Sequence, residues 1–561
     1  MKPLQRVAHH FKRGEYDHVE RLCGIILAKD PTEARAWQMR GLAALHRRQF
    51  ADAAACLRES VALKESPQAY INLSAALLAL DRPGEGIAPL RRALELDAQS
   101  AGAYLSLACC HFGERRYQDA EAAIERAVSI CPGWPKALDM QARIALRIGD
   151  IERAFALANA ALASDRSLSV SHRVLADIAM HRMDYDLAKT HYLRSIRNNP
   201  HDPEAFGNFA LLLSRRGEYE DAIGLYKRAI AFLPDDEMLQ HGLADMLLIQ
   251  GRLVEGFPLQ GWRHMRTDEN LPLVDVPFPP ALPKGPSAVA VLDQGVGDQI
   301  MMSNLIPDLT AQIQNLEVYC DPRLKTLFQR SFPNAEFKSY THALRSTATA
   351  SAAPGSFGMV DIAHWLRPSF DSFPRHEGYL KPDPQLRTAL RNRYTSRPGP
   401  IIGIAWATRK SIKLGPHKSL PLAAWGPLLS IPGATFVNLQ YDSDLEEVAN
   451  AAWEFGARII SDPEIDAGGD LDDYAAQVAA MDLVISTSSA SAHMGGALNV
   501  PTWVFVPLGI GGLWHWFTDR EDSPWYPSVR LFRQSTRGEW GDVVERASTA
   551  LDAFMQSWSA K

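Results

Sequence analysis

The hydrophobic pattern of the first 260 residues is self-similar. A small residue recurs at spacings of 33 or 34, at Ala53, Gly86, Ala120, Ala154, Ala188, Ala222 and Gly256, and Val19 holds the same place in the first copy. Small side chains let the two helices of a hairpin cross closely, and Pro31, Pro132, Pro200 and Pro234 end the second helices of their copies. The pattern therefore predicts seven full helical hairpins and a degenerate eighth at residues 251–265.

The best copy, "EAFGNFALLLSRRGEYEDAIGLYKRAIAFLPDD" at residues 204–236, resembles the 34-residue tetratricopeptide repeat. A single hairpin cannot bury its apolar face, so the resemblance implies that neighbours stack into a right-handed superhelix with a concave groove. Such a groove usually binds protein in extended or helical form. Because repeat architecture alone does not fix a ligand, the alternative is an array that only scaffolds or dimerises.

Beyond the repeats, short apolar runs alternate with helical stretches. Buried parallel strands with helices between them predict doubly wound sheets. The runs interpreted as strands are 287–295, 316–321 and 358–364 in one unit, and 400–407, 434–440, 457–462, 481–488 and 501–507 in another. Proline-rich residues 268–287 break every periodic pattern and indicate a linker.

These patterns predict a multidomain chain: an α-solenoid followed by a two-lobed α/β module with two Rossmann-like domains. The predicted domains are a repeat superhelix (1–266), a Pro-rich linker (267–286), a first α/β lobe (287–396) and a second lobe (397–561). A length of 561 residues exceeds what one hydrophobic core usually serves, which agrees with several domains.

Charge and composition exclude some classes of protein. A net charge of −6 argues against a general preference for nucleic acid or anionic membranes. The first residues lack the apolar core of a signal peptide, and no apolar run is long enough to span a bilayer, so a cytoplasmic protein is expected. The six cysteines show no C-x-x-C pairing, which predicts neither disulfides nor zinc.

In open α/β sheets the ligand lies beyond the carboxyl ends of the strands, so chemistry is expected in the loops there. The first such loop, Gly295 to Gln299, precedes a helix-like run but lacks the third small residue of a dinucleotide fingerprint. Another, "STSSASAHMGGALNVP" at 486–501, joins a strand to a helix start near Ser491. Its small residues and free N–H groups predict an anion site, to which His493 can add a donor. An ordinary serine-capped helix is the alternative.

Four motifs together resemble the catalytic module of bacterial tetratricopeptide-fused GT-B glycosyltransferases, relatives of the lipopolysaccharide heptosyltransferases. They are "GVGDQIMMSNLIPDL", "GIAWATRKSIKLGPHKSLPLAAWGPLLSIPGATFVNLQ", "MDLVISTSSASAHMGGALNVPTWVFVP" and "REDSPWYPSVRLFRQ". Among such fusions the arrangement looks most like the alphaproteobacterial flagellin glycosyltransferases, which place pseudaminic-acid-like nonulosonic sugars on Ser or Thr. One departure is Ser488 and Ser489, where heptosyltransferases carry an Asp-Thr pair.

The resemblance implies roles for particular residues. Asp298 matches the aspartate proposed as base for the acceptor hydroxyl, with a helix N-cap as the alternative role. Lys418 matches the family lysine that holds the donor phosphate. The predicted donor-binding residues are Lys418, Thr408, Arg409, Gln440, Ser488, Ser489, Ser491 and His493; those of the acceptor side and its loops are Gly295, Gly297, Gln299, Trp514 and Trp525. Trp514 and Trp525 have core packing as an equal alternative.

No metal or other cofactor is expected, because fixed donors can neutralise the leaving group. The D-x-D strings at Asp442 to Asp444 and Asp470 to Asp472 both precede helices, where capping is the better interpretation. The substrates expected from the resemblance are a nucleotide sugar, with a CMP-nonulosonic acid favoured, and flagellin bound by the repeats. Two alternatives remain: a transferase acting on a lipid-linked or other glycan acceptor, and a catalytically degenerate repeat scaffold.

Overall fold

The computed structural model describes residues 3–265, 280–292, 294–339, 356–395, 397–408 and 415–558. The chain divides into two compact units, Met1–Ala205 and Phe206–Lys561. The division after Ala205 does not coincide with any domain boundary expected from the sequence, and those boundaries remain predictions. Most of the expected linker lies outside the described residues.

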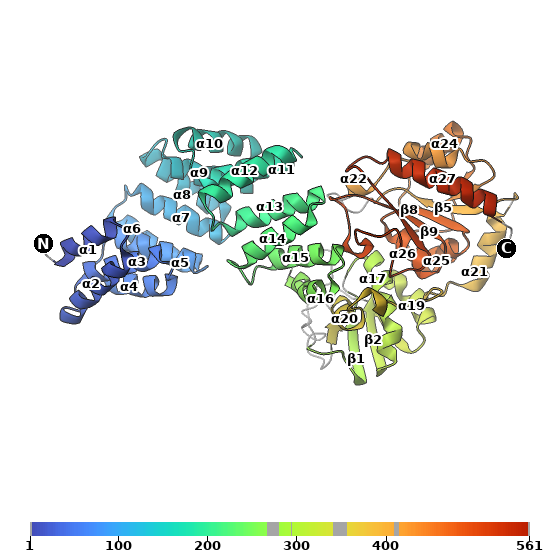
Figure 1. Cartoon of the computed structure of the whole chain (residues 1–561), viewed down its shortest axis with the longest axis horizontal. Coiled ribbons are helices and arrows are strands. Elements are labelled where there is room, and N and C mark those ends of the chain that lie inside the picture. Colours follow the sequence, from blue (N-terminus) through green and yellow to red (C-terminus); the bar gives the residue numbers. More distant parts are fainter. Residues whose placement is uncertain are drawn as a thin grey trace. The chain divides into compact units, whose positions relative to one another are not determined.

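The first unit consists of helical hairpins (Figure 1). Their helices are α1 (Pro3–Lys12), α2 (Tyr16–Lys29), α3 (Ala34–His46), α4 (Phe50–Leu63), α5 (Pro67–Ala79), α6 (Pro83–Leu96), α7 (Ala101–Gly113), α8 (Tyr117–Ile130), α9 (Pro135–Arg147), α10 (Ile151–Ser164), α11 (Ser169–His181) and α12 (Tyr185–Asn198). Successive helices pack as α3 with α4, α5 with α6, and so on through α11 with α12. Each hairpin corresponds to one predicted copy of the sequence pattern.

The seventh and eighth hairpins continue this order. They contain α13 (Pro203–Arg216), α14 (Tyr219–Ile230), α15 (Glu237–Ile249) and α16 (Leu253–Gly256), followed by the 3-10 segment Phe257–Met265. The eighth copy is degenerate because its second α-helix is only four residues long.

The recurring small residues lie where the helices of a hairpin cross. All of them are buried, and Val19 is buried at the same place in α2. A Cβ on Gly86 would lie 2.6 Å from Ser74 Oγ, and one on Gly256 would lie 2.6 Å from Leu248 Cγ. The close crossing predicted from the sequence is confirmed.

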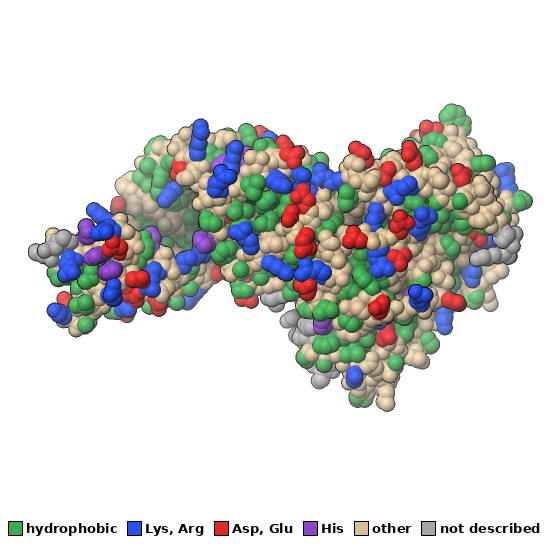
Figure 2. Space-filling model, in the orientation of Figure 1, with side chains coloured by type: hydrophobic (Ala, Val, Ile, Leu, Met, Phe, Trp, Pro, Cys, Tyr) green, Lys and Arg blue, Asp and Glu red, His purple; other side chains and the backbone are tan. Residues whose placement is uncertain are grey.

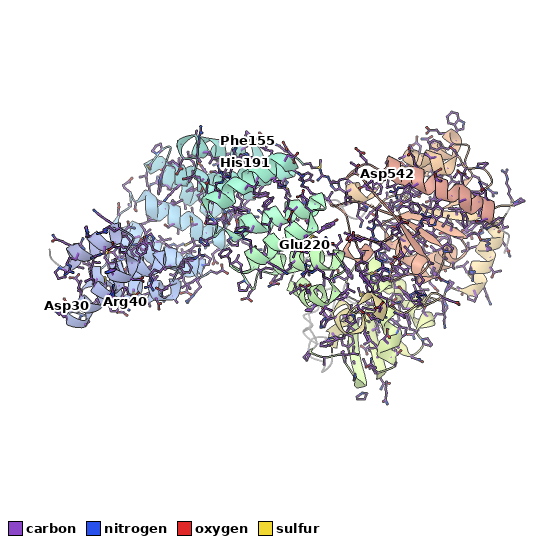
Figure 3. The ribbon with its side chains drawn as sticks, in the orientation of Figure 1. Asp30, Arg40, Phe155, His191, Glu220 and Asp542 are labelled. Carbon is purple, nitrogen blue, oxygen red and sulfur yellow. The ribbon has the colours of Figure 1, made fainter. Side chains whose placement is uncertain are left out.

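Ion pairs connect adjacent repeats on their exposed surface. Arg92 of α6 pairs with Glu65 just after α4 at 2.7 Å, and Arg182 pairs with Glu152 of α10 at 2.8 Å. Glu220 of α14, labelled in Figure 3, lies 3.4 Å from Arg252. On the face drawn in Figure 2, basic and acidic side chains are interspersed. Exposed pairs contribute little each, so the apolar crossings stabilise the repeats more than these exposed pairs do.

The first sheet has four parallel strands in the order β3-β2-β1-β4. Its strands are β1 (Gly285–Val291), β2 (Ile313–Cys320), β3 (Ala335–Ser339) and β4 (Ser356–Gly358). The helices around it are α17 (Val296–Met302), α18 (Ile306–Thr310), α19 (Lys325–Ser331) and α20 (Met359–Leu366), with 3-10 turns at Ser303–Leu305, Pro322–Leu324 and Phe370–Ser372.

One prediction for this sheet was wrong, and one strand was not anticipated. Residues 358–364 were expected to form a strand, but the strand ends at Gly358 and Met359–Leu366 is helical. A short apolar run fits a buried helix as well as a buried strand, so the spacing of its apolar residues could not distinguish a helix from a strand. Strand β3 was missed because its sequence, AEFKS, carries two charged residues in five.

The second sheet has six parallel strands in the order β10-β9-β8-β5-β6-β7. Its strands are β5 (Ile401–Ala405), β6 (Thr435–Asn438), β7 (Ile459–Ile460), β8 (Leu483–Thr487), β9 (Thr502–Val506) and β10 (Val529–Arg533). Its helices are α21 (Pro384–Tyr394), α22 (Gly415–Lys418), α23 (Gly426–Leu429), α24 (Leu445–Glu454), α25 (Leu471–Ala479), α26 (Ala490–Ala497) and α27 (Gly541–Ser557), with 3-10 turns at Leu422–Trp425 and Trp514–Trp516. The five strands expected here are present, and β10 was not anticipated.

Each sheet has a point where the strand order reverses. In the first sheet the chain runs from β1 outward to β2 and β3, then returns to place β4 on the other side of β1. In the second it runs from β5 to β6 and β7, then returns to place β8 on the other side of β5. Ligands of open α/β sheets bind beyond the carboxyl ends of the strands at such points. The expected binding positions are therefore the loop after β1 and the loops after β5 and β8.

The loop after β9 is fixed on the seventh hairpin by Gly509. Its φ of +73° is left-handed, and a Cβ there would lie 2.2 Å from the carbonyl oxygen of Arg215. The next residue, Ile510, donates its N–H to that same oxygen at 3.1 Å. The close approach of the two backbones requires a residue without a side chain.

We expect Gly509→Ala to lower the free energy of unfolding by about 2–4 kcal/mol, since the left-handed conformation and the clash both oppose a side chain. Gly538→Ala is the matched control: its φ is +79°, but nothing lies within 4 Å of the added Cβ. Denaturant unfolding of the two variants measures the difference. Equal losses would show that the contact with Arg215 contributes nothing.

Among the described residues, no helix is long and apolar enough to cross a membrane.

Candidate functional site at the two sheet reversals

Asp298 lies just beyond the carboxyl end of β1, in the first turn of α17. The N-cap of this helix is Gly295, so Asp298 is not the N-cap residue. Its side chain is 37% exposed, which leaves the carboxylate open to a substrate.

Lys418 lies at the end of α22, in the loop after β5, and is buried. Burial lowers the pKa of this ammonium to about 8, while the charge of Asp298 acts in the opposite direction. The loops from the two sheet reversals therefore bring an acid of one lobe near a base of the other. An ammonium with such a pKa is still mostly charged at neutral pH and loses its charge at a lower pH than an ordinary lysine.

The third loop, after β8, forms the start of α26. Strand β8 ends at Thr487, Ser489 is the N-cap, and its side chain makes no capping hydrogen bond. Its hydroxyl instead lies 3.0 Å from Ser486 Oγ. The helix N-terminus is thus not closed by its own cap, and the positive end of its dipole is suited to an anion.

The other serines of this loop are engaged by aromatic residues. Trp516 Nε1 donates to Ser488 Oγ at 2.7 Å, and the Tyr474 hydroxyl donates to Ser491 Oγ at 2.7 Å. Gly495 lies against β9, where a Cβ would be 2.4 Å from Thr502 Oγ1. These contacts hold α26 and its first turn against the sheet and the neighbouring aromatic residues.

His493 is buried between the lobes. Its Nδ1 lies 2.8 Å from the Tyr526 hydroxyl, and its ring stacks on Trp516 with centroids 5.0 Å apart. A Cβ on Gly297 of α17 would be 2.9 Å from its Cδ2. Burial lowers the pKa of His493 to about 3, so it is neutral at neutral pH. His493 contacts residues of both lobes, and its ring leaves no room for a side chain at Gly297.

His515 completes the cluster. It is 2% exposed, its Nδ1 lies 3.9 Å from Asp298 Oδ1, and neither ring nitrogen has a hydrogen-bond partner within the described residues. Burial, with the nearby charge of Lys418, holds the pKa of His515 far below its usual range. A neutral imidazole at this distance can accept or donate a hydrogen bond once a substrate group tightens the site.

The structure describes two of the remaining predicted donor-binding residues, Gln440 and Thr408, but not Arg409. Gln440 was expected at the nucleotide, but its buried amide is bound by the backbone of Trp406, Ala407 and Tyr441, which leaves little for a ligand. Thr408 lies beyond β5, and its buried hydroxyl has no partner within the described residues. Arg409 lies outside the described residues.

Two of the predicted acceptor-side residues are structural. Gln299 is buried, donating to the carbonyl of Gln294 and accepting from the N–H of Asp321. Trp525 is fully buried, with its ring 4.7 Å from that of Phe373, so packing is the correct alternative for it. Trp514 is partly exposed, and its ring lies 5.7 Å from that of Phe257.

The two D-x-D strings precede helices as expected. Asp444 accepts from the N–H groups of Glu446 and Glu447 at the start of α24, and Asp470 accepts from the N–H of Asp472 at the start of α25. Both capping predictions are confirmed. Asp472 also pairs with Arg330 of the first lobe.

Sequence reasoning missed Trp516 and Tyr526, which hold Ser488 and His493. The segment 514–526 is visibly rich in aromatic residues, but its sequence does not say which rings point at the helix start. The assembled site combines a carboxylate, a buried lysine with a lowered pKa, a helix N-terminus and a buried neutral histidine. This set can accept a proton on one side and stabilise an anion on the other.

A family profile described as the tetratricopeptide repeat matches residues 71–135, 140–203 and 173–237. These matches run from α5 to the start of α15. The hairpins from α5 to α14 are therefore tetratricopeptide repeats, which confirms the sequence prediction for these copies and indicates a role in protein interaction.

Among curated proteins, Protein FlbA of Caulobacter vibrioides (strain ATCC 19089 / CIP 103742 / CB 15) is similar to this chain. The two are 32% identical over 386 residues, which cover 65% of this chain and 63% of the relative. The chain thus spans less than two thirds of that relative's length.

Solved structures resemble parts of the chain. They include the APC/C hetero-tetramer Cut9-Hcn1 (17% identity, TM-score 0.38, 44% of this chain and 49% of that one). Yeast Tom70 matches with 18% identity and a TM-score of 0.33, over 45% of this chain and 56% of its own. The type IV pilus biogenesis factor PilW matches with 20% identity and a TM-score of 0.32, over 36% of this chain and 94% of its own.

Proposed function

We propose that this protein is a GT-B glycosyltransferase that moves a sugar from a nucleotide donor to a Ser or Thr hydroxyl of a protein. The observation that carries the proposal is the meeting of the two sheet reversals, with Asp298 on one lobe and Lys418 with the start of α26 on the other. The four sequence motifs that resemble such transferases include all three of these elements.

In the proposed reaction the acceptor hydroxyl oxygen attacks the anomeric carbon, and its proton passes to Asp298. The bond between that carbon and the phosphate oxygen breaks, and its electron pair leaves with the phosphate. Lys418 and the N–H groups of α26 stabilise the new charge. A single displacement of this kind inverts the anomeric centre, and its leaving group is neutralised without a metal ion.

The repeats give the reason to propose a protein acceptor. Eight helical hairpins are a large surface for a small acceptor, whereas repeats of this class typically bind polypeptide. Flagellin is the acceptor that the resemblance favours. The test is transfer to purified flagellin by the full chain, followed by mass spectrometry of the product. Transfer to a lipid-linked glycan with none to flagellin would favour the second acceptor class, and absence of both transfer and sugar-nucleotide hydrolysis would favour a scaffold.

The donor proposed is a CMP-linked nonulosonic acid such as pseudaminic acid. Ser488 and Ser489 stand where related heptosyltransferases place an acid, and they carry no charge to repel the sugar's carboxylate. A single phosphate also needs fewer cations than a diphosphate, and Lys418 is the basic residue that the described site provides.

We therefore expect CMP to bind more tightly than UDP or ADP. Calorimetry with the three nucleotides under one set of conditions measures the order. A clear preference for UDP or ADP would rule out the nonulosonic donor while leaving the transferase proposal in place.

A further inference from the structure

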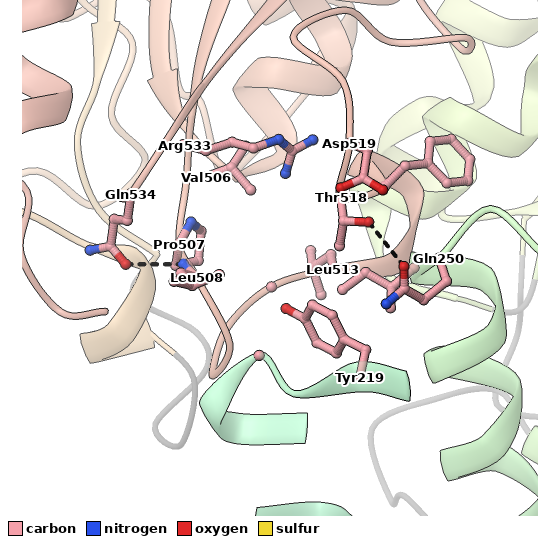
Figure 4. Close-up of a pocket in the computed structure, with 14 residues that line it drawn as sticks. Tyr219, Gln250, Val506, Pro507, Leu508, Leu513, Thr518, Asp519, Arg533 and Gln534 are labelled. Atoms are coloured by element: carbon pink, nitrogen blue, oxygen red, sulfur yellow. Dashed lines mark hydrogen bonds between the residues drawn. The ribbon is translucent and has the colours of Figure 1, made fainter. Parts of the chain in front are cut away.

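A pocket of about 380 Å³ lies between the last repeats and the second lobe, apart from the cluster around Asp298 (Figure 4). Tyr219 and Gln250 line it from the repeats, and Leu513, Asp519 and Arg533 line it from the lobe. A second cavity of about 390 Å³ adjoins it and shares Gln250 and the segment 517–519. The hydrogen bond from Thr518 to Gln250, 3.3 Å long, lies where the two cavities meet.

Arg533 provides the positive charge of the pocket. Its guanidinium points into the cavity in Figure 4, and the hydrogen bonds it makes run to the backbone carbonyls of Arg520 and Trp516. Within the described part of the chain, no carboxylate lies at ion-pair distance from it. Burial lowers its pKa to about 10, although Tyr219 and Asp519 act in the opposite direction. A partly desolvated guanidinium without a bound carboxylate is suited to an incoming one.

The same segment of chain joins the pocket to the reaction site. Residues 513–519 line the cavity at Leu513, Phe517, Thr518 and Asp519, and between them the turn Trp514–Trp516 holds His515 beside Asp298. Phe517 has a φ of +52°, an uncommon conformation for a bulky residue that proteins retain chiefly where function requires it. A chain seated in the pocket would therefore contact the same segment that holds His515 beside Asp298.

We propose that this pocket is an acceptor subsite in which Arg533 binds the carboxylate of an Asp or Glu near the modified Ser or Thr. The inference rests on the proposed function, because it assumes that the repeats present a polypeptide to the site. An extended polypeptide suits the pocket better than a small anion for two reasons. The two cavities adjoin, and one wall belongs to repeats of a class that binds protein.

The test measures flagellin binding to the full chain by calorimetry without donor, together with CMP affinity. We expect Arg533→Gln to weaken flagellin binding about tenfold or more, since a charge-assisted bidentate contact is lost, and to leave CMP affinity unchanged. Arg530→Gln, on the same strand but exposed and outside the pocket, should alter neither quantity.

Because Arg533→Gln also removes the hydrogen bonds that Arg533 makes to the backbone, a second variant tests the pocket with Arg533 unchanged. Thr518→Glu leaves those contacts in place and adds a second carboxylate to the pocket beside that of Asp519, so it should weaken flagellin binding by a similar factor. Unchanged flagellin binding in Thr518→Glu overturns the proposal, as does a loss of CMP affinity in Arg533→Gln with flagellin binding intact. If the unaltered protein binds no flagellin, the proposed acceptor itself fails and the inference fails with it.

Discussion

Asp298→Asn should lower sugar transfer by a factor of about 10² or more, the usual contribution of a positioned general base. The amide keeps the size of the side chain and its place in the first turn of α17, but it cannot take the proton of the acceptor hydroxyl. Folding, flagellin binding and nucleotide binding should persist, so the loss should appear in kcat. Single-turnover transfer to flagellin measures it.

The control is Glu336→Gln, which removes an exposed carboxylate from the same lobe and should leave turnover unchanged. Near-normal turnover of Asp298→Asn would mean that its carboxylate serves only the helix start. A loss of flagellin affinity with unchanged kcat would assign Asp298 to acceptor binding rather than proton transfer.

Lys418→Met should stabilise the fold while it impairs the donor site. The pKa of Lys418 falls from 10.5 to about 8 in the folded protein, a difference worth roughly 3 kcal/mol at neutral pH. Methionine keeps much of the apolar stem and removes the buried charge. We expect the melting temperature to rise by a few degrees and CMP affinity to fall about tenfold or more, because the phosphate loses its cation.

The pH dependence follows from the same shift. The folded pKa lies below the unfolded one, so between about pH 8 and 10.5 the unfolded chain binds more protons and stability rises with pH. Nucleotide affinity should move oppositely and decline above pH 8, as Lys418 loses its charge. Lys325→Met, on the exposed surface of the first lobe, is the control. A Lys418→Met variant with unchanged nucleotide affinity and the same pH profile would exclude Lys418 from the phosphate site.

The repeats could be predicted from sequence because their information is local. The crossing of two helices depends on one small side chain per copy, and a period of 33 or 34 marks that position directly. The loops after β1, β5 and β8 were also predictable, since they follow apolar runs that end in glycine, basic or hydroxyl residues. The capping roles of Asp444 and Asp470 were also predictable, because a cap depends only on the helix that begins directly after it.

Other assignments failed because the deciding partner lies far along the chain. Residues 359–366 form a helix although their apolar run also fits a strand, and tertiary contacts, chiefly with the segment Phe257–Met265, decide between the two. Gln440 has the chemistry of a ligand-binding amide, yet the backbone at Trp406 and Ala407 occupies it. Trp525 is in the core because Phe373, some 150 positions earlier, packs against it.

The sequence by itself determined the repeats, the two parallel α/β lobes, and the presence of Asp298 and Lys418 in loops that follow strands. Only the tertiary structure decided that those loops meet, because the order of strands in a sheet depends on pairing between distant segments. It also set the pKa of Lys418 and left His515 without a partner among the described residues, since burial depends on every element packed around a side chain.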